Sequence, residues 1–260
     1  YLVVPCVIIN SFCIDNTAEN MQILCHSAIL TFAGLFLSIA VSFIIFRKDG
    51  LTDFAVAFSH CGFMGIPLIT ATIGSHAVFY MTVMLVFAVI FQWTYGLFLM
   101  TGNPAVLQPK KLITNPTIIS DLIGCVLFVF RIPLPQIVSN TFAALTGLNA
   151  PLSMMVLGVY LAQSDLIQAF KDKRVYLASF VRLLLIPIAT VFLFKLIPIG
   201  FTELKITILI AASCPAGSST ALFAKEHGKD FVLASEEVCI TTLLSLITIP
   251  LIIQLASAVL

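Results

Sequence analysis

Long apolar stretches separated by short polar connections make up almost the whole chain. A short apolar stretch opens it over residues 1–13. Eight longer ones follow over residues 23–46, 52–73, 76–100, 113–130, 134–163, 174–197, 203–224 and 231–258. Because a membrane crossing takes about 20 residues, these eight stretches predict transmembrane helices. We expect residues 1–13 to form the second half of a further helix, and the stretch 134–163 to be interrupted at Gly147 and Pro151.

Two of the predicted helices are interrupted near their middle by helix-breaking and small polar residues. The first interruption contains Ser59, His60, Cys61, Gly62, Gly65 and Pro67, and the second contains Ser213, Cys214, Pro215, Ala216, Gly217, Ser218 and Ser219. Lipid cannot satisfy backbone groups freed by such a break, so the break must face protein or a wet cavity. Paired interruptions in two halves of a chain indicate a transporter's binding site. These residues are therefore the expected substrate contacts, with Pro67 and Pro215 at the crossing.

The composition defines the class of protein. Hydrophobic residues make up 60% of the 260 positions, charged residues 10%, and the mean hydropathy is +1.12. In soluble domains about a quarter of the residues are charged. The sequence therefore predicts an all-α polytopic membrane protein in a lipid bilayer. The net charge of +1 offers no basic surface for nucleic acid. The seven cysteines lie in apolar segments without metal-ligand spacing, so we expect no metal site, no cofactor and no enzyme activity.

Basic residues orient the predicted helices. One side carries nine of them: Arg47, Lys48, Lys110, Lys111, Lys171, Lys173, Arg174, Lys225 and Lys229. The other side carries only Arg131, Lys195 and Lys205. Positive loops stay in the cytoplasm, so we expect a multi-pass plasma-membrane protein with these Lys/Arg-rich loops inside and its C-terminus outside.

Proline spacing indicates an internal repeat. Pro5 precedes Pro67 by 62 residues, and Pro151 precedes Pro215 by 64. The single transmembrane domain, residues 1–260, would then hold a first repeat over 1–100 that lacks its first helix and a second over 113–260. An odd number of crossings between matched helices makes the repeats inverted in the membrane.

Several short motifs together resemble the auxin efflux carrier family, whose bacterial members include malate- and malonate-type permeases. They are Gly62-Phe63-Met64-Gly65-Ile66-Pro67-Leu68, Asn115-Pro116, Ala150-Pro151-Leu152, Cys214-Pro215-Ala216, Ala224-Lys225-Glu226 and Thr242-Leu243-Leu244-Ser245-Leu246. The resemblance implies two inverted five-helix repeats with crossed broken helices. It also implies an elevator architecture like that of bile-acid symporters and Na⁺/H⁺ antiporters, and a homodimer.

The resemblance also implies a division of the helices into two units. The first, fifth and sixth predicted helices would form a scaffold, and the others a moving transport unit. Pro5, Asn10, Pro151 and Met154 are then the expected scaffold contacts. This chain departs from its relatives at His60-Cys61-Gly62, where they commonly carry Asn-Thr-Gly.

The chemistry of the breaks favours an anionic substrate. Each broken helix presents a new N-terminus with unpaired amides and partial positive charge, which suits a small organic carboxylate without a basic side chain. Serine hydroxyls at Ser59, Ser213, Ser218 and Ser219 could add donors. The alternative is that the serines bond back to their own helices and the glycines only permit close packing.

Three titratable side chains inside predicted helices are candidates for coupling to a proton or sodium ion: His60, Asp121 and Arg182. His60 is either a substrate contact or proton carrier, since imidazole titrates near 6.5, or a neutral histidine bonded between helices. Intramembrane charges indicate function by default. Arg182 could instead snorkel to the surface, and we expect Glu236 and Glu237 to reach water.

We therefore expect a secondary or facilitative carrier of small organic anions, such as dicarboxylates or auxin-like carboxylates. A membrane sensor that binds the same ligand is an alternative, but it should carry an additional signalling domain. A cation or proton antiporter of the same architecture is a second alternative, although neither cluster of helix breakers contains a carboxylate.

Overall fold

The computed structural model describes residues 2–103, 112–163 and 172–260, and these residues are almost entirely helical. The first half contains α1 (Val3–Ser11), α2 (Ala18–Phe46), α3 (Gly50–Ala57), η1 (Cys61–Gly65), α4 (Ile66–Thr72), α5 (Ala77–Phe91), η2 (Gln92–Gly96) and α6 (Leu97–Thr101). The second half contains α8 (Pro116–Val129), α9 (Gln136–Gly147), α10 (Asn149–Gln163), α12 (Lys173–Phe180), η4 (Val181–Leu185), α13 (Ile186–Leu196), α14 (Thr202–Ser213), α15 (Ser219–Glu226) and α16 (Phe231–Val259). The three η segments are π-helical turns.

Four of the eight expected membrane helices are confirmed as continuous spans. Within the described residues, four helical stretches are long and apolar enough to cross a membrane: Ala18–Phe46, Ala77–Thr101, Lys173–Leu196 and Phe231–Val259. Capping explains where three of them start, because Thr17, Asp172 and Asp230 each accept a hydrogen bond from a backbone amide of the first turn. The sixth predicted helix is interrupted between α9 and α10, directly after Gly147, but not at Pro151, because Pro151 lies in the first turn of α10.

Both predicted broken helices are also confirmed. In the first, α3 ends at Ala57 and the chain resumes its helical course in η1 and α4. In the second, α14 ends at Ser213 and α15 starts at Ser219. The two extended connections meet each other, as an antiparallel pair between Ser59 and Ala216.

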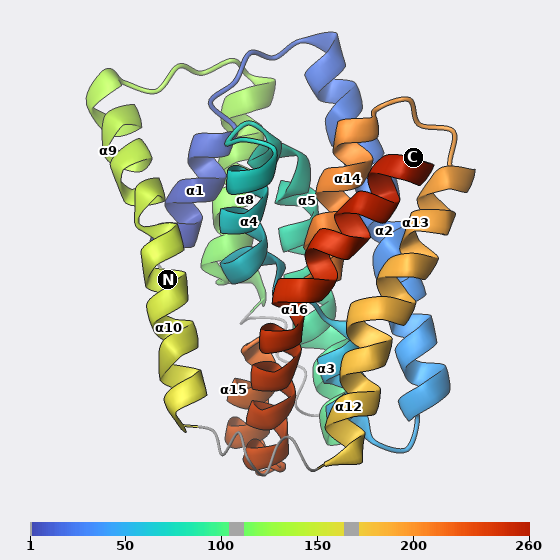
Figure 1. The fold of residues 1–260 in the computed structure, drawn as a ribbon. Coiled ribbons are helices and arrows are strands. Elements are labelled where there is room, and N and C mark those ends of the chain that lie inside the picture. Colours follow the sequence, from blue (N-terminus) through green and yellow to red (C-terminus); the bar gives the residue numbers. More distant parts are fainter. Residues whose placement is uncertain (1, 104–111, 164–171) are drawn as a thin grey trace.

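The helices around these breaks form two groups in Figure 1. Helices α9 and α10 line one side of the molecule, with α1 packed against α8 and α9. On the other side α2 packs against α3, α5, α13 and α14, and α16 packs against α12, α14 and α15. Half-helices α3 and α15 lie in the lower part of the view, and α4 and α14 lie above them (Figure 1). The element order agrees with the expected inverted repeats, which remain a prediction.

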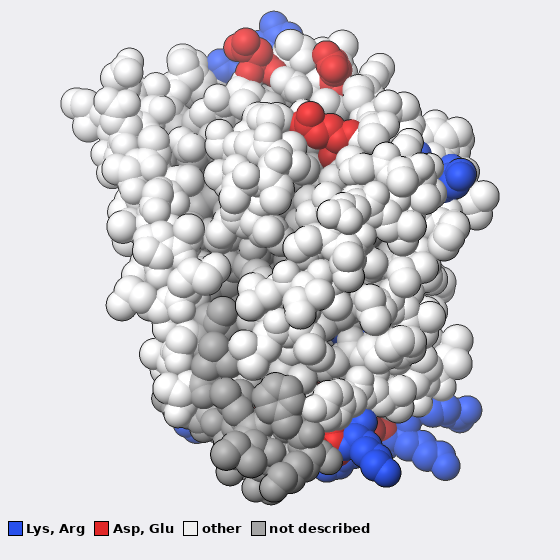
Figure 2. Space-filling view, viewed as in Figure 1, with Lys and Arg blue, Asp and Glu red and all other residues white. Residues whose placement is uncertain are grey.

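On the surface shown in Figure 2, charged side chains gather toward the two ends of the molecule, with apolar surface between them. Figure 2 shows lysines and arginines gathered at the lower end, where α12 begins in Figure 1. The middle is white in this view, and large apolar side chains such as Phe36, Ile44 and Leu246 are exposed. Such a belt is expected of a surface that contacts lipid. Lys110, Lys111 and Lys171 lie outside the described residues.

Candidate functional site

The two broken helices cross through backbone contacts. The amide of His60 donates to the carbonyl of Pro215 at 2.8 Å. The amide of Ala216 donates to Oγ1 of Thr241 on α16 at 3.2 Å. Backbone groups freed by the breaks thus find partners inside the protein, as a break in a lipid environment requires.

Pro215 lies at this crossing, as expected, but Pro67 does not. Pro67 occupies the first turn of α4, several residues after the extended segment that pairs with Ala216. Proline suits this position because it has no amide hydrogen to satisfy in the first turn of a helix. The expectation that both prolines cross is therefore wrong. The interruption in the first broken helix is set at Phe58–His60 instead.

Arg182 stabilises the crossing from within, and of the two interpretations of its position, the one in which it snorkels to the surface is wrong. Its side chain is 1% exposed. The guanidinium donates to the carbonyls of Val56 and Cys214 at 2.9 and 3.0 Å, and also to that of Ala212. These carbonyls belong to the C-terminal ends of α3 and α14, where the helix dipole is negative. One cation therefore neutralises both C-terminal ends, and a hydrogen bond of 3.1 Å to Oγ of Ser38 fixes it to α2.

A cavity of about 440 Å³ opens beside the crossing, between α1, α5, α8, α10 and the broken helices. Its polar lining comes from Ser59, His60, Gln92, Asn115, Thr117, Ser218 and Ser219. Its apolar lining includes Val4, Pro5, Phe63, Leu85, Val89, Val156 and Leu222, and Cys61 and Gly62 complete the side at the first break. This volume suits a small organic molecule.

His60 lines the cavity at the first break. Its ring stacks on Phe63 with centroids 5.4 Å apart and planes at 11°. Nε2 lies 3.3 Å from Oγ of Ser218, the N-cap of α15. The imidazole therefore links the first broken helix to the start of the half-helix in the second.

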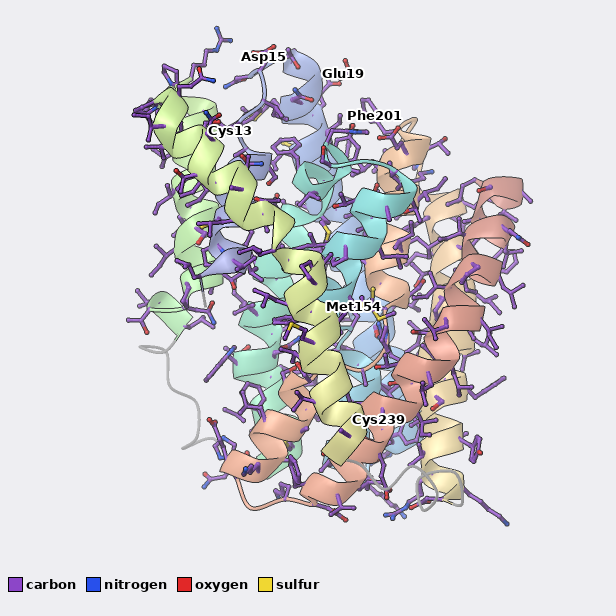
Figure 3. All side chains as sticks on the ribbon, turned by 60° about the vertical axis from the view of Figure 1, so that its left-hand side comes forward. Cys13, Asp15, Glu19, Met154, Phe201 and Cys239 are labelled. Atoms are coloured by element: carbon purple, nitrogen blue, oxygen red, sulfur yellow. The ribbon has the colours of Figure 1, made fainter. Side chains whose placement is uncertain are left out.

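A smaller pocket continues from His60 toward α10 and α16. It is lined by His60, Phe63, Met64, Ser153, Met154, Val156, Ser218, Val238 and Thr242. Met154 projects from the middle of α10 (Figure 3) and is half exposed. Of the expected scaffold contacts, Pro5 and Met154 line one of these two cavities, whereas Asn10 and Pro151 line neither.

The remaining expected contacts support the crossing from behind. Gly65, Ser213, Cys214, Pro215, Ala216 and Gly217 are buried and, like Pro67, line neither of the two cavities. Oγ of Ser213 donates to the carbonyl of Leu209 at 2.7 Å, so the back-bonding interpretation holds for this serine. A Cβ at Gly65 would lie 3.5 Å from Sγ of Cys214, an ordinary van der Waals contact, so close packing does not require glycine at this position.

Sequence reasoning missed the polar residues on the opposite wall, Gln92, Asn115 and Thr117. Gln92 is the only amide side chain inside the apolar stretch 76–100, a signal that could have identified it. Asn115 caps α8 by accepting the amide of Thr117 at 2.9 Å. Asp121 lies one helical turn beyond Thr117 and is 8% exposed, but it lines neither of these cavities.

Glu236 and Glu237 do not reach water, so that expectation is also wrong. They are 5% and 0% exposed on α16, because α3, α12 and α15 pack around this helix. Oε1 of Glu237 lies within hydrogen-bond distance of Oγ1 of Thr52, at 2.7 Å. Among the described residues, no group of three or more His, Cys, Asp or Glu is arranged to hold a metal ion.

Comparison with known proteins gives two matches. A model of the family described as membrane transport protein matches residues 1–253. An uncharacterized transporter of Methanothermobacter thermautotrophicus is 29% identical over 209 residues, which cover 78% of this chain and 66% of that relative. The chain thus spans slightly less than two thirds of the relative's length.

Proposed function

The chain belongs to the membrane transport protein family, that of the auxin efflux carriers, and on this premise we propose that it carries small organic anions across the plasma membrane. Dicarboxylates and auxin-like carboxylates are the substrate classes that fit. The observation that supports this most is the cavity beside the crossing, which His60 and the N-terminus of α15 line together.

The electrostatics of the crossing favour an anion. The negative C-terminal ends of α3 and α14 are occupied by the guanidinium of Arg182, so they do not repel a carboxylate. The start of α15 faces the cavity through Ser218 and Ser219, where the helix dipole is positive. Hydroxyl and amide donors of Ser218, Gln92 and Thr117 can then orient the carboxylate oxygens.

Transport in this proposal follows an elevator movement of two units. The scaffold comprises α1, α8, α9 and α10, and the transport unit comprises the broken helices with α2, α5, α6, α12, α13 and α16. The cavity lies between the two units, with Pro5 and Asn115 from one and His60 and Ser218 from the other. In this proposal the basic end of the molecule lies in the cytoplasm and the C-terminus lies outside. The scaffold would also provide the surface through which two copies form a dimer.

Uptake of radiolabelled carboxylates into proteoliposomes, using the full-length protein, tests this function. We expect saturable uptake of at least one dicarboxylate or aromatic carboxylate, and none of a neutral amide analogue. H60N keeps a hydrogen-bonding side chain but cannot titrate, so it should keep uptake and flatten its pH profile between about 5.5 and 7.5, around the histidine value.

Two outcomes would contradict these expectations. If the folded, ligand-free protein takes up no carboxylate, the proposed carrier function is overturned. If H60N has the same pH profile as the wild type, the role of His60 is structural. A cation or proton antiporter remains the second candidate, because Asp53 and Glu237 are both fully buried beside the crossing helices. Cation flux driven by a pH gradient in the absence of any carboxylate would favour it.

A further inference from the structure

Two carboxyl groups share one hydroxyl at the lower end of the transport unit. Oγ1 of Thr52 on α3 lies 2.7 Å from Oε1 of Glu237 and 2.9 Å from Oδ2 of Asp49. Asp49 is also the N-cap of α3, where its Oδ1 accepts the amide of Thr52 at 3.3 Å. The three side chains form a chain of hydrogen bonds from the start of α3 to the buried face of α16.

This chain of contacts lacks a proton if both acids are ionised. A threonine hydroxyl has one hydrogen to donate and otherwise only accepts. Two carboxylates cannot both receive that hydrogen, and the second would face the hydroxyl oxygen with no hydrogen between them. Both contacts become hydrogen bonds when one carboxyl group is protonated and donates to Thr52, which then donates to the other.

The buried position identifies Glu237 as the protonated partner. Glu237 is 0% exposed, and its Oε2 has no hydrogen-bond partner within the described part of the chain. An ionised carboxylate with an unpaired oxygen is costly to bury. Asp49 is partly exposed at the start of a helix, where the dipole favours its ionised form. The arrangement is therefore Glu237–OH to Thr52 to Asp49 carboxylate.

We infer that Glu237 is a proton-binding site of the transport unit, loaded through Thr52 and Asp49 from the basic end of the molecule. Loading starts when Asp49 takes a proton from water. Asp49 then passes this proton to the oxygen of Thr52, and Thr52 passes its own hydroxyl proton to the carboxylate of Glu237. One proton enters, Glu237 becomes neutral, and no electrons are exchanged. Release is the reverse.

The proton site is connected to the crossing through one turn of α16. Thr241, four residues after Glu237, donates to the carbonyl of Glu237 at 2.6 Å and accepts the amide of Ala216 at the crossing. Cys239, between them in sequence, lies in the lower half of α16 (Figure 3). The charge state of Glu237 thus changes close to the backbone pair that holds the two broken helices together.

The charged groups around Glu237 come from several elements. Asp49 precedes α3, and Asp172 and Arg174 stand at the start of α12. Other titratable side chains near this end of the packed helices include Asp53 on α3, Lys173 on α12, Lys225 and Glu226 on α15, Asp230 before α16, and Glu236 beside Glu237 on α16. Asp53 forms its own bond, 2.5 Å from Oγ of Ser42, on the side of α3 that faces α2.

The proton site at Glu237 deepens the proposed function. Only one of its consequences, the coupling of the proton to substrate transport, rests on that function. If the chain is a carrier, the proton is its coupling ion, and Glu237 carries it while the substrate occupies the cavity beside His60. Occupancy of Glu237 by a proton can be measured without any transport.

Infrared difference spectroscopy of the purified full-length protein tests the occupancy. A protonated carboxyl group gives a C=O band that is distinct from carboxylate bands and shifts in D₂O. Among the described residues, Asp53 and Asp121 are also buried with one unpartnered oxygen each, so the band at neutral pH can have several components. We expect E237Q, which keeps the hydrogen bond to Thr52, to remove one component of the wild-type band. E236Q is the matched control and should retain that component, as should D121N and D53N. T52V keeps the side-chain shape, so it should shift the band and slow its exchange in D₂O.

The spectrum can overturn the site directly. If E237Q loses intensity only in the carboxylate bands, and its unfolding temperature shows that the variant is folded, then Glu237 is ionised in the wild type. A band that persists unchanged in T52V would show that Thr52 does not contact the protonated group.

Uptake in proteoliposomes with and without an imposed pH gradient tests the coupling. With any carboxylate that the wild type transports, the gradient should raise wild-type uptake several-fold and leave E237Q uptake unchanged, while E237Q still equilibrates the substrate. An equal response of E237Q would overturn the coupling even if the infrared band is present. If no carboxylate is taken up by the wild type, the carrier function fails, and the infrared result still decides the proton site.

Discussion

At the scale of single residues, the crossing depends on side chains whose burial forces them to find partners. Arg182 is the clearest case, because a fully buried guanidinium is tolerated only with several acceptors, and here carbonyls of both broken helices supply them. Its planar fork is suited to bridging two helix ends at once. A substrate carboxylate in the neighbouring cavity therefore meets helix ends that are already neutralised.

Removing this cation should destabilise the whole protein. R182A leaves buried carbonyls unpaired at two helix ends, and hydrogen bonds to charged groups are each worth about 1.5–3 kcal/mol, so we expect a large drop in the thermal unfolding temperature and no uptake. R182K keeps the charge but not the fork and should lie between R182A and the wild type.

The control for this comparison is R174A. Arg174 forms an exposed pair with Asp172 at 2.8 Å, with 61% of its side chain accessible, and exposed pairs contribute about 0–1 kcal/mol. Equal unfolding temperatures for R182A and R174A would contradict the role assigned to Arg182.

At the scale of elements, the half-helix α3 packs closely against η2 and α6 because small residues bring the backbones together. Gly50 begins α3 directly against the backbone of Leu99 in α6, and a Cβ there would overlap the Leu99 carbonyl. At Gly96, a Cβ would lie 2.6 Å from ring atoms of Phe54 and Phe58. The position of α3, and with it that of Asp49 and Thr52, is thus fixed by this contact.

G50A should therefore displace α3. Because the obstacle is backbone, the helix itself must shift, and overpacking of this kind costs about 1–3 kcal/mol. We expect a lower unfolding temperature, measured on the purified protein in detergent. G147A is the matched control, since a Cβ at the end of α9 meets nothing within 4 Å. G147A should match the wild type or exceed it slightly, and a comparable loss in both variants would exclude the close approach as the cause.

At the scale of the whole molecule, the cavities beside His60 lie between two groups of helices, which is where an elevator carrier must slide. Met154 on α10 and Thr242 on α16 line the same small pocket from opposite sides of the proposed boundary. By contrast, Gly34 on α2 and Thr190 on α13 would lie within one unit, since a Cβ at Gly34 would be 3.8 Å from Cγ2 of Thr190.

Crosslinking these two pairs tests the division. In a background that lacks the exposed Cys13 and Cys25, bridging M154C to T242C with a short bifunctional thiol reagent should abolish uptake, because it ties the transport unit to the scaffold. Bridging G34C to T190C should leave uptake close to that of the unbridged protein. The opposite result for the two pairs would refute the proposed units.

The sequence by itself determined the helices and their interruptions. Lipid requires every backbone group to be satisfied, so apolar stretches of this length predict helices, and the clusters of Gly, Pro and Ser at Ser59–Pro67 and Ser213–Ser219 predict breaks. The cavity residues nearest the breaks, His60 and Ser218, could be predicted for the same reason.

Only the tertiary structure decided which side chains meet. The long helices are apolar on nearly every face, so periodicity does not indicate which face is inside. Neither the burial of Arg182 and Glu237 nor the contribution of Gln92 to the cavity could therefore be read from the pattern. Pro67 shows the same limit, because proline marks the first turn of a helix as readily as a break. The sequence determines where the backbone must leave the helix, whereas packing between distant segments decides what it meets there.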